Sequence, residues 1–156
     1  MRQQFARFLQ ARIESDPAIL FVTADLGYGL FDEIQESYPY NFLNCGAAEH
    51  LMIAMCVGAC YEGRKPVAYS ITPFLLCRPF EVIRNYVAKE QLNIKLIGSG
   101  RGKDYAHDGF SHWAEDDGAV MAALNIQKRW PTVESLQDDL TEAFDSTRPY
   151  YINLKR

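Results

Sequence analysis

The sequence lacks the features that mark several large classes of protein. It has no basic run, and its 16 Lys and Arg against 20 Asp and Glu give a formal net charge of −4, which argues against nucleic acid as a partner. No stretch approaches the roughly 20 apolar residues that span a bilayer, so no membrane segment is expected. No strand-like run is followed by G-x-G-x-x-G or a P-loop, which argues against a lone nucleotide-binding domain.

Cysteine and histidine are scarce, and their spacing does not indicate a metal site. There is no C-x-x-C pair, and the three histidines form neither H-x-x-x-H nor H-E-x-x-H, so no metal ligands are predicted in this chain. The cysteines lie in or beside apolar stretches, which predicts buried, reduced thiols and a cytoplasmic location. They are Cys45, Cys56, Cys60 and Cys77.

The length of 156 residues suits one domain with a core of its own. No Pro-rich or Gly/Ser-rich linker and no internal repeat divides the chain, so residues 1–156 are predicted to form a single domain. The first segment, "MRQQFARFLQARIESDP", places Phe5, Phe8, Leu9 and Ile13 at helical spacing among charges. This pattern predicts an amphipathic helix and not a signal peptide.

Short apolar runs then alternate with helical segments. Strands are predicted over 18–25, 41–46, 66–72, 93–100, 126–130 and 150–154. Helices are predicted over 48–62, 79–90, 115–124 and 133–146, the last with Thr132 as its N-cap. Repeated strand and helix predicts an α/β fold with a mostly parallel six-stranded sheet and helices on both faces. Function in such sheets gathers in loops after the carboxyl ends of strands.

One of these loops leads to a single acid at the start of an apolar helix. The stretch "NCGAAEHLMIAMCVGACYEG" places Glu49 before a long uncharged segment, and a helix that is apolar all round is expected to be buried. Two interpretations stay open from these residues. Either the helix dipole stabilises a carboxylate in the first turn, which this stretch alone favours, or a partly desolvated acid shares a proton with a heteroaromatic nitrogen.

The loop 98–112 is long for a compact domain, which favours a functional role. It holds His107 and His112, which we interpret as hydrogen-bonding or proton-transfer groups, together with Asp108. In the loop 71–78, Phe74 is expected before the next helix begins, where its ring face can meet a ligand. A solvated loop whose glycines satisfy turns stays a plausible interpretation for three other loop residues: Lys103, Asp104 and Tyr105.

Five segments together resemble a known family. They are "TADLG", "NFLNCGAAEHLMIAM", "YSITPFLLCRPFEVIRN", "KLIGSG" and "DGFSHWAEDD". In this order and at these separations they resemble the pyrimidine-binding domain of transketolase, which occurs in thiamine-diphosphate enzymes of the transketolase and 1-deoxyxylulose-5-phosphate synthase group. The resemblance covers nearly the whole chain. It implies an enzyme subunit that transfers a two-carbon ketol unit between sugar-like substrates.

The resemblance also implies cofactor-binding residues. Glu49 occupies the place of the family's catalytic glutamate, which hydrogen-bonds N1′ of the aminopyrimidine ring and promotes loss of the C2 proton of thiamine diphosphate. Phe74 resembles the aromatic residue that stacks on this ring. Asp25 matches the acid of the family's "ADL" turn near the cofactor, and Arg78 lies in the same loop as an arginine of related sequences.

Substrate-binding residues follow from the same resemblance. Asp108 and His112 match the family's residues that contact the hydroxyls and the carbonyl of the sugar. His112 is also expected to be catalytic, and His107 is expected to bind substrate with them. Arg2 and Arg156 fall where family members bind the substrate phosphate. The sequence departs from the pattern at two glycines, because a further substrate histidine is replaced by Gly100 and a phosphate-contacting serine by Gly29.

The chain has no G-D-G…N segment, the family's site for Mg²⁺ and diphosphate. The resemblance therefore implies a separate diphosphate-binding subunit that holds Mg²⁺, and a heterotetramer of two of each chain with the cofactor between unlike subunits. Two alternatives stay open. One is a subunit of a thiamine-diphosphate-dependent 2-oxo-acid decarboxylase or acyloin synthase. The other is a non-catalytic regulatory module, against which Glu49, Asp108 and His112 together argue.

Overall fold

The computed structural model describes all residues from Met1 to Arg156. One all-parallel sheet of six strands has the order β2-β1-β3-β4-β6-β5, which confirms the predicted fold class. The strands are β1 (Ile19–Thr23), β2 (Phe42–Asn44), β3 (Lys65–Ile71), β4 (Lys95–Ser99), β5 (Gln127–Arg129) and β6 (Tyr150–Leu154). Each coincides with a predicted run to within two residues at either end, and the inner strands β1, β3, β4 and β6 are almost wholly apolar because they are buried on both faces.

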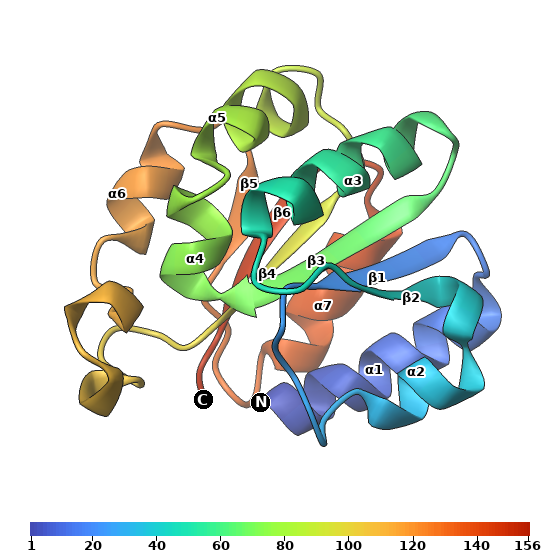
Figure 1. Ribbon diagram of the computed structural model, residues 1–156, viewed down its shortest axis with the longest axis horizontal. Helices are drawn as coiled ribbons and strands as arrows, with labels where there is room; N and C mark the ends of the chain where they lie inside the picture. Colours follow the sequence, from blue (N-terminus) through green and yellow to red (C-terminus); the bar gives the residue numbers. More distant parts are fainter.

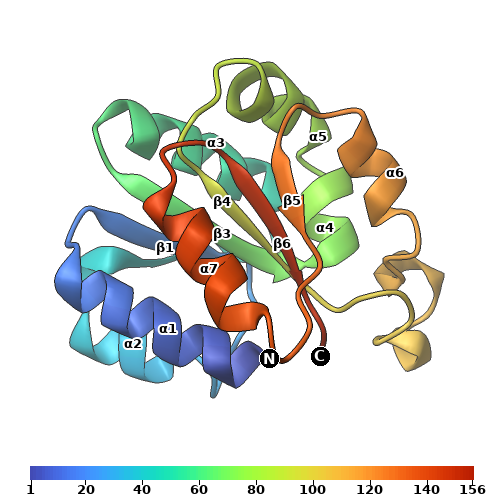
Figure 2. The same ribbon diagram turned by 180° about the vertical axis from the view of Figure 1, so that it is seen from behind.

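Helices cover both faces of the sheet. On one face lie α1 (Arg2–Ser15), α2 (Asp32–Ser37) and α7 (Leu136–Asp145) (Figure 2). On the other lie α3 (Glu49–Tyr61), α4 (Thr72–Cys77), α5 (Phe80–Val82), the π-helix Ile83–Ala88 and α6 (Asp117–Ala122) (Figure 1). Short 3₁₀-helices span Pro39–Asn41, Ala106–Asp108 and Phe110–His112. None of the helices combines the length and apolar composition that a membrane crossing requires.

Alternation along the strands divides the core in two. On β3, Val67 and Tyr69 pack against the side of α1 and α7, whereas Ala68 packs against the side of α3 and α4. The strand order reverses between β1 and β3, and α3 crosses the sheet at this point. The crevice at such a reversal, at the carboxyl ends of the strands, is where parallel α/β sheets bind ligands.

Two α-helices were not predicted, and one begins later than predicted. α2 and α4 have six residues each, too few for a clear helical period. α7 begins at Leu136 with Ser135 as its N-cap. Thr132 instead closes the turn before it, because the Ser135 N–H donates to Thr132 Oγ1 and the Thr132 N–H donates to Ser135 Oγ.

Two predictions of burial were wrong. α3 is apolar all round, yet its outer side is exposed at Leu51, Ala54, Met55 and Gly58, with 51% of Leu51 and 38% of Met55 accessible. All four cysteines are free thiols, but only Cys56 is buried, and Cys77 is exposed on α4. An uncharged, exposed helix side of this kind is typical of a surface that meets another protein.

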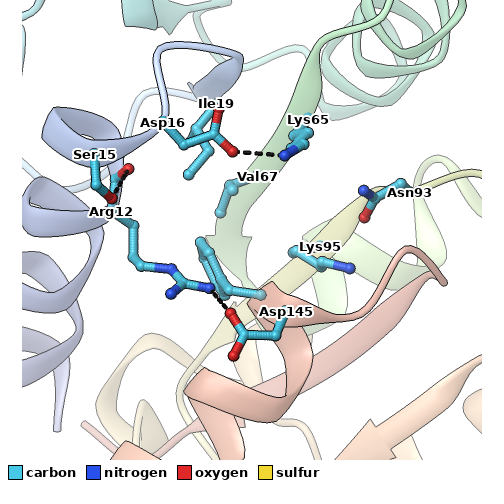
Figure 3. Close-up of a pocket in the computed structure, with 10 residues that line it drawn as sticks. Arg12, Ser15, Asp16, Ile19, Lys65, Val67, Asn93, Lys95 and Asp145 are labelled. Carbon is cyan, nitrogen blue, oxygen red and sulfur yellow. Dashed lines mark hydrogen bonds and ion pairs between the residues drawn. The ribbon is translucent and has the colours of Figure 1, made fainter.

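The amino ends of β1, β3 and β4 form a cavity of about 300 Å³ at the edge of the sheet opposite the reversal crevice (Figure 3). The ion pair of Lys65 with Asp16 lies at its rim, with 2.6 Å between nitrogen and oxygen. Lys95 is almost fully buried here, and its Nζ donates to the carbonyls of Ser146 (2.9 Å) and Arg148 (2.6 Å). The ammonium thus caps the C-terminal end of α7, where a cation is favourable.

Burial lowers the pKa of Lys95 to about 7. Between this value and the unfolded value near 10.4, the unfolded chain binds a proton that the folded chain does not, so stability rises with pH. We expect the free energy of unfolding of the wild type, relative to Lys95→Met, to increase by about 2 to 3 kcal/mol from pH 7 to 9.5. Urea denaturation of both proteins measures this difference, and a difference that does not change with pH would contradict the prediction.

Candidate active site

Glu49 is the first residue of α3, and only 3% of it is exposed. Its Oε2 lies 2.7 Å from Nη1 of Arg78, and Ser70 Oγ donates to its Oε1 across 3.5 Å, a long and weak hydrogen bond. The carboxyl group is therefore directed at side chains of α4 and β3. The helix dipole accounts for an acid at this position of α3, but it does not account for this direction. The result is a buried carboxylate with one cationic partner and one weakly bonded oxygen.

Phe74 and Arg78 lie four residues apart, so they share one side of α4 and its C-terminal end. The guanidinium carbon of Arg78 is 3.7 Å from the centroid of the Phe74 ring. The prediction that Phe74 precedes a helix was wrong, because it lies inside α4. The "TP" at the start of α4 was the available signal, since proline favours the first turn of a helix.

His112 contacts Phe74 edge to face, with ring centroids 4.8 Å apart. Its Nδ1 is 3.1 Å from Ser111 Oγ, and its Nε2 has no hydrogen bond within the chain. The loop 98–112 thus brings its second histidine onto α4, next to the ring that also contacts Arg78. Glu49, Arg78, Phe74 and His112 form one continuous line of contacts.

His107 and Asp108 lie apart from this line. Nε2 of His107 is 3.1 Å from Oδ2 of Asp108, and 67% of the His107 side chain is exposed. Both belong to the short 3₁₀-helix Ala106–Asp108, and neither has a hydrogen bond to His112. Of the three predicted substrate-binding residues in this loop, His107 and Asp108 therefore pair with each other, whereas His112 packs against α4.

Arg2 and Arg156 come from opposite ends of the sequence and line one cavity of about 610 Å³ with the loop 26–30. The two ends of the chain lie close together in Figures 1 and 2. Neither arginine forms an ion pair, and both contact Tyr105. Arg2 Nη1 is 3.5 Å from the Tyr105 hydroxyl, and the Arg156 guanidinium is 4.7 Å from the ring centroid.

Asp25 has a φ of +51°, in the left-handed region that non-glycine residues rarely adopt. Asn44 holds this conformation, because its Oδ1 accepts from the N–H groups of Asp25 (3.0 Å) and Gly46 (2.9 Å). The Tyr28 hydroxyl donates to the Asp25 carboxylate, which raises the pKa of Tyr28. Asp25 thus lies beside the loop that leads to Glu49, without a hydrogen bond to Glu49 itself.

Sequence reasoning missed three residues that hold this arrangement. Ser70 and Asn44 position Glu49 and its loop, and the "N-x-G" before Glu49 is a signal for the second. A solvated role was plausible for Tyr105, but only 7% of it is exposed. Nowhere do three or more His, Cys, Asp or Glu side chains gather as metal ligands.

An all-parallel domain with a buried acid, an aromatic ring and a histidine at its strand-reversal crevice belongs to the class of doubly wound α/β domains that bind small ligands there. The family model described as "Transketolase, pyrimidine binding domain" matches residues 1–134. The chain therefore belongs to the transketolase pyrimidine-binding domain family, as its resemblance in sequence predicted.

Similar proteins agree with this assignment. The putative transketolase C-terminal section of Methanocaldococcus jannaschii is 37% identical over 89 residues, 57% of this chain and 28% of the relative. The 6-deoxy-6-sulfo-D-fructose transketolase subunit SqwH of a Clostridium species is 27% identical over the whole chain and 49% of the relative. A structure titled "Split gene transketolase, inactive beta4 tetramer" has a TM-score of 0.85 and 28% identity, over 99% of this chain and 51% of that one. The chain spans about half or less of the length of these proteins.

Proposed function

We propose that this chain is the pyrimidine-binding subunit of a thiamine-diphosphate-dependent transferase that moves a two-carbon ketol unit between sugar-like substrates. The observation that carries the proposal is Glu49, a buried acid at the strand-reversal crevice with one weakly bonded oxygen. Membership of the family supports the same assignment. Several relatives are named as transketolase subunits, which supports an enzymatic role for this chain.

The residues present fit the pyrimidine end of the cofactor. Glu49 Oε1 is the acceptor that would hold a proton shared with a ring nitrogen, while Arg78 keeps the other oxygen in place. The Phe74 ring, held in place by its contacts with Arg78 and His112, would pack against the pyrimidine ring. When bound, thiamine diphosphate supplies an acidic C2 position that adds to carbonyl groups. Asp25, in its constrained loop, would contact the cofactor at the margin of the same crevice.

The diphosphate end and Mg²⁺ would be held by a separate subunit. Two relatives are named as a transketolase C-terminal section and as a transketolase subunit, which supports a partner chain. No carboxylate cluster here suits Mg²⁺, which prefers oxygen ligands in octahedral geometry. The exposed side of α3, Leu51, Ala54, Met55 and Gly58, begins two residues after Glu49 and suits such a partner. We propose two of each chain in the complex, and the tetramer named for the split-gene neighbour supports self-association. The four free thiols are compatible with a reducing cytoplasm.

The substrate would lie between α4 and the chain ends. His112, with its free Nε2, and the pair His107–Asp108 would contact the carbonyl and hydroxyls, and Arg2 with Arg156 would bind an anionic group. One relative is named for 6-deoxy-6-sulfo-D-fructose, and another, from Phocaeicola vulgatus, is named for apulose 4-phosphate. Both names contain an anionic group, which supports this role for the arginines.

The isolated chain should bind thiamine diphosphate weakly and without dependence on Mg²⁺, because it offers the pyrimidine side of the site alone. Isothermal titration calorimetry with and without Mg²⁺ measures this, and ketol transfer is then assayed after addition of a diphosphate-binding transketolase chain. Tight, Mg²⁺-dependent binding by the isolated chain would show that a diphosphate site exists within these residues. Absence of ketol transfer in the reconstituted complex would overturn the proposed function.

A further inference from the structure

Tyr105 is a buried residue in a mostly exposed loop. Its hydroxyl is 2.9 Å from Ser99 Oγ at the carboxyl end of β4, and Arg2 Nη1 approaches the same oxygen at 3.5 Å. The Arg156 guanidinium lies over the Tyr105 ring, and the centroids of the Tyr105 and His112 rings are 6.4 Å apart. Tyr105 is therefore the side chain that connects the His112 end of the site with the two arginines.

Gly100 creates the space for this ring. A Cβ at Gly100 would lie 2.4 Å from Tyr105 Cε2 and 2.5 Å from Cδ2, closer than real carbon atoms approach. Gly100 also has a φ of +90°, and its carbonyl accepts from Thr72 Oγ1 at 2.7 Å, so its backbone is tied to α4. Any side chain at position 100 would displace the Tyr105 ring. The ring thus occupies the place that a residue 100 side chain would otherwise fill.

The surroundings of Tyr105 favour an anion. The cavity lined by Arg2 and Arg156 has no acidic residue in its wall. The Tyr69 hydroxyl is buried, has no hydrogen-bond partner and faces Arg2 and Ser99. Two arginines without ion pairs therefore line this cavity, and both contact Tyr105, whose buried hydroxyl is 3.5 Å from Arg2 Nη1 and 2.9 Å from Ser99 Oγ. A phosphate, sulfonate or carboxylate is the chemical group that such donors bind best.

We propose that Tyr105 is a specificity-determining residue. Because it packs on Gly100, it holds Arg2 and Arg156 at a fixed distance from His112. The site thereby selects substrates with an anionic group at the end remote from the carbonyl. The inference rests on the proposed function and deepens it. Tyr105 acts in two separable ways. The hydroxyl positions Arg2, and the ring supports Arg156 and sets the length of the site.

Two pairs of variants test these roles in the reconstituted complex. Tyr105→Phe removes the hydroxyl and keeps the ring, whereas Tyr105→Ala removes both. Gly100→Ala pushes the ring aside, and Gly102→Ala is its matched control, because Gly102 also has a positive φ (+52°) but a Cβ there meets no atom within 4 Å. The assay is kcat/KM for aldoses of increasing chain length, each with and without a terminal phosphate.

In Tyr105→Phe, we expect KM for phosphorylated aldoses to rise about threefold to tenfold with kcat nearly unchanged, since the hydroxyl loses its contact with Arg2 and the 2.9 Å hydrogen bond with Ser99 Oγ that fixes it. In Tyr105→Ala and Gly100→Ala, the ratio of kcat/KM for phosphorylated over free aldoses should fall at least about tenfold and longer aldoses should gain. Gly102→Ala should keep the wild-type ratio. Unchanged ratios in both Tyr105→Ala and Gly100→Ala would overturn the proposal.

A binding measurement keeps this test independent of turnover. We titrate the isolated chain with inorganic phosphate and follow the arginine side-chain signals by NMR. Wild type should respond at Arg2 and Arg156, and Tyr105→Ala should weaken the affinity about tenfold. Absence of a phosphate response in wild type, or equal affinity in Tyr105→Ala, overturns the role of Tyr105. Absence of ketol transfer with an intact phosphate response overturns the proposed function alone.

Discussion

Glu49→Gln should leave the complex with the diphosphate-binding chain assembled and slow C2 proton exchange of bound thiamine diphosphate by about 10²- to 10⁴-fold, the range for general acid–base catalysis. The substitution keeps the shape of a buried side chain, and its amide oxygen can still accept from Arg78 Nη1, which lies 2.7 Å from Glu49 Oε2. The fold should therefore survive. What is lost is the group that shares a proton, so the defect should lie in chemistry and not in binding.

Proton exchange followed by NMR measures this effect without a carbonyl substrate. Glu62→Gln is the matched control, because Glu62 is exposed at the C-terminal end of the same helix and undergoes the same chemical change. Calorimetry on both variants verifies that thiamine diphosphate still binds. Exchange within about threefold of wild type in Glu49→Gln, with binding intact, would remove Glu49 from the catalytic role.

The inner strands β1, β3, β4 and β6 were predictable from the sequence because burial on both faces leaves an apolar run with clear ends. The short helices were not, and α4 is the instructive case. Its residues Leu75 and Leu76 are buried, whereas Cys77 and Arg78 are exposed, and six residues give less than two helical turns in which to see a period. The sequence does not show which side of this segment packs on the sheet, because the buried side depends on the position of β4 beneath α4.

The outer side of α3 shows a limit of pattern reasoning. The rule that a helix apolar all round is buried assumes that the burying partner belongs to the same chain. Here Leu51 and Met55 face outward, although nothing in their identity separates them from the buried Met52 and Ile53. The rule still carries information about function, because an apolar side without a partner in the fold favours a partner subunit.

The candidate site residues could be named from the sequence, but their geometry could not. Glu49 and Arg78 are 29 residues apart, and only the crossing of α3 over β1 and β3 brings them together. From the sequence, a solvated role in the long loop was plausible for Tyr105. Its burial depends on the absence of a side chain at Gly100, a long-range effect that loop composition does not reveal.

His112→Ala should lower kcat/KM for ketol transfer by about 10²-fold while leaving C2 proton exchange near the wild-type rate. The magnitude is that of one hydrogen-bond donor to the developing charge on a carbonyl oxygen. His112 suits this role because its Nε2 is free, while Ser111 at Nδ1 and Phe74 at the ring fix its orientation. Steady-state kinetics and proton exchange on the same reconstituted complexes separate the effect from that of Glu49→Gln, which should lower both quantities.

His112→Gln tests whether a hydrogen-bond donor at this position is enough or whether an imidazole is needed. The glutamine amide nitrogen reaches about as far as Nε2, so this variant should have a higher kcat/KM than His112→Ala. It should not restore any pH dependence that belongs to the imidazole. Asp108→Ala should act in the same direction more weakly, because Asp108 pairs with the exposed His107 and has no hydrogen bond or ion pair with His112. If His112→Ala turns over its best acceptor like the wild type, the loop 98–112 holds the arginines through Tyr105 but does not touch the carbonyl, and the carbonyl contact would have to come from the partner subunit. Equal loss of exchange and turnover in His112→Ala would instead place the histidine at the cofactor, since only a group that acts before the carbonyl arrives can slow exchange.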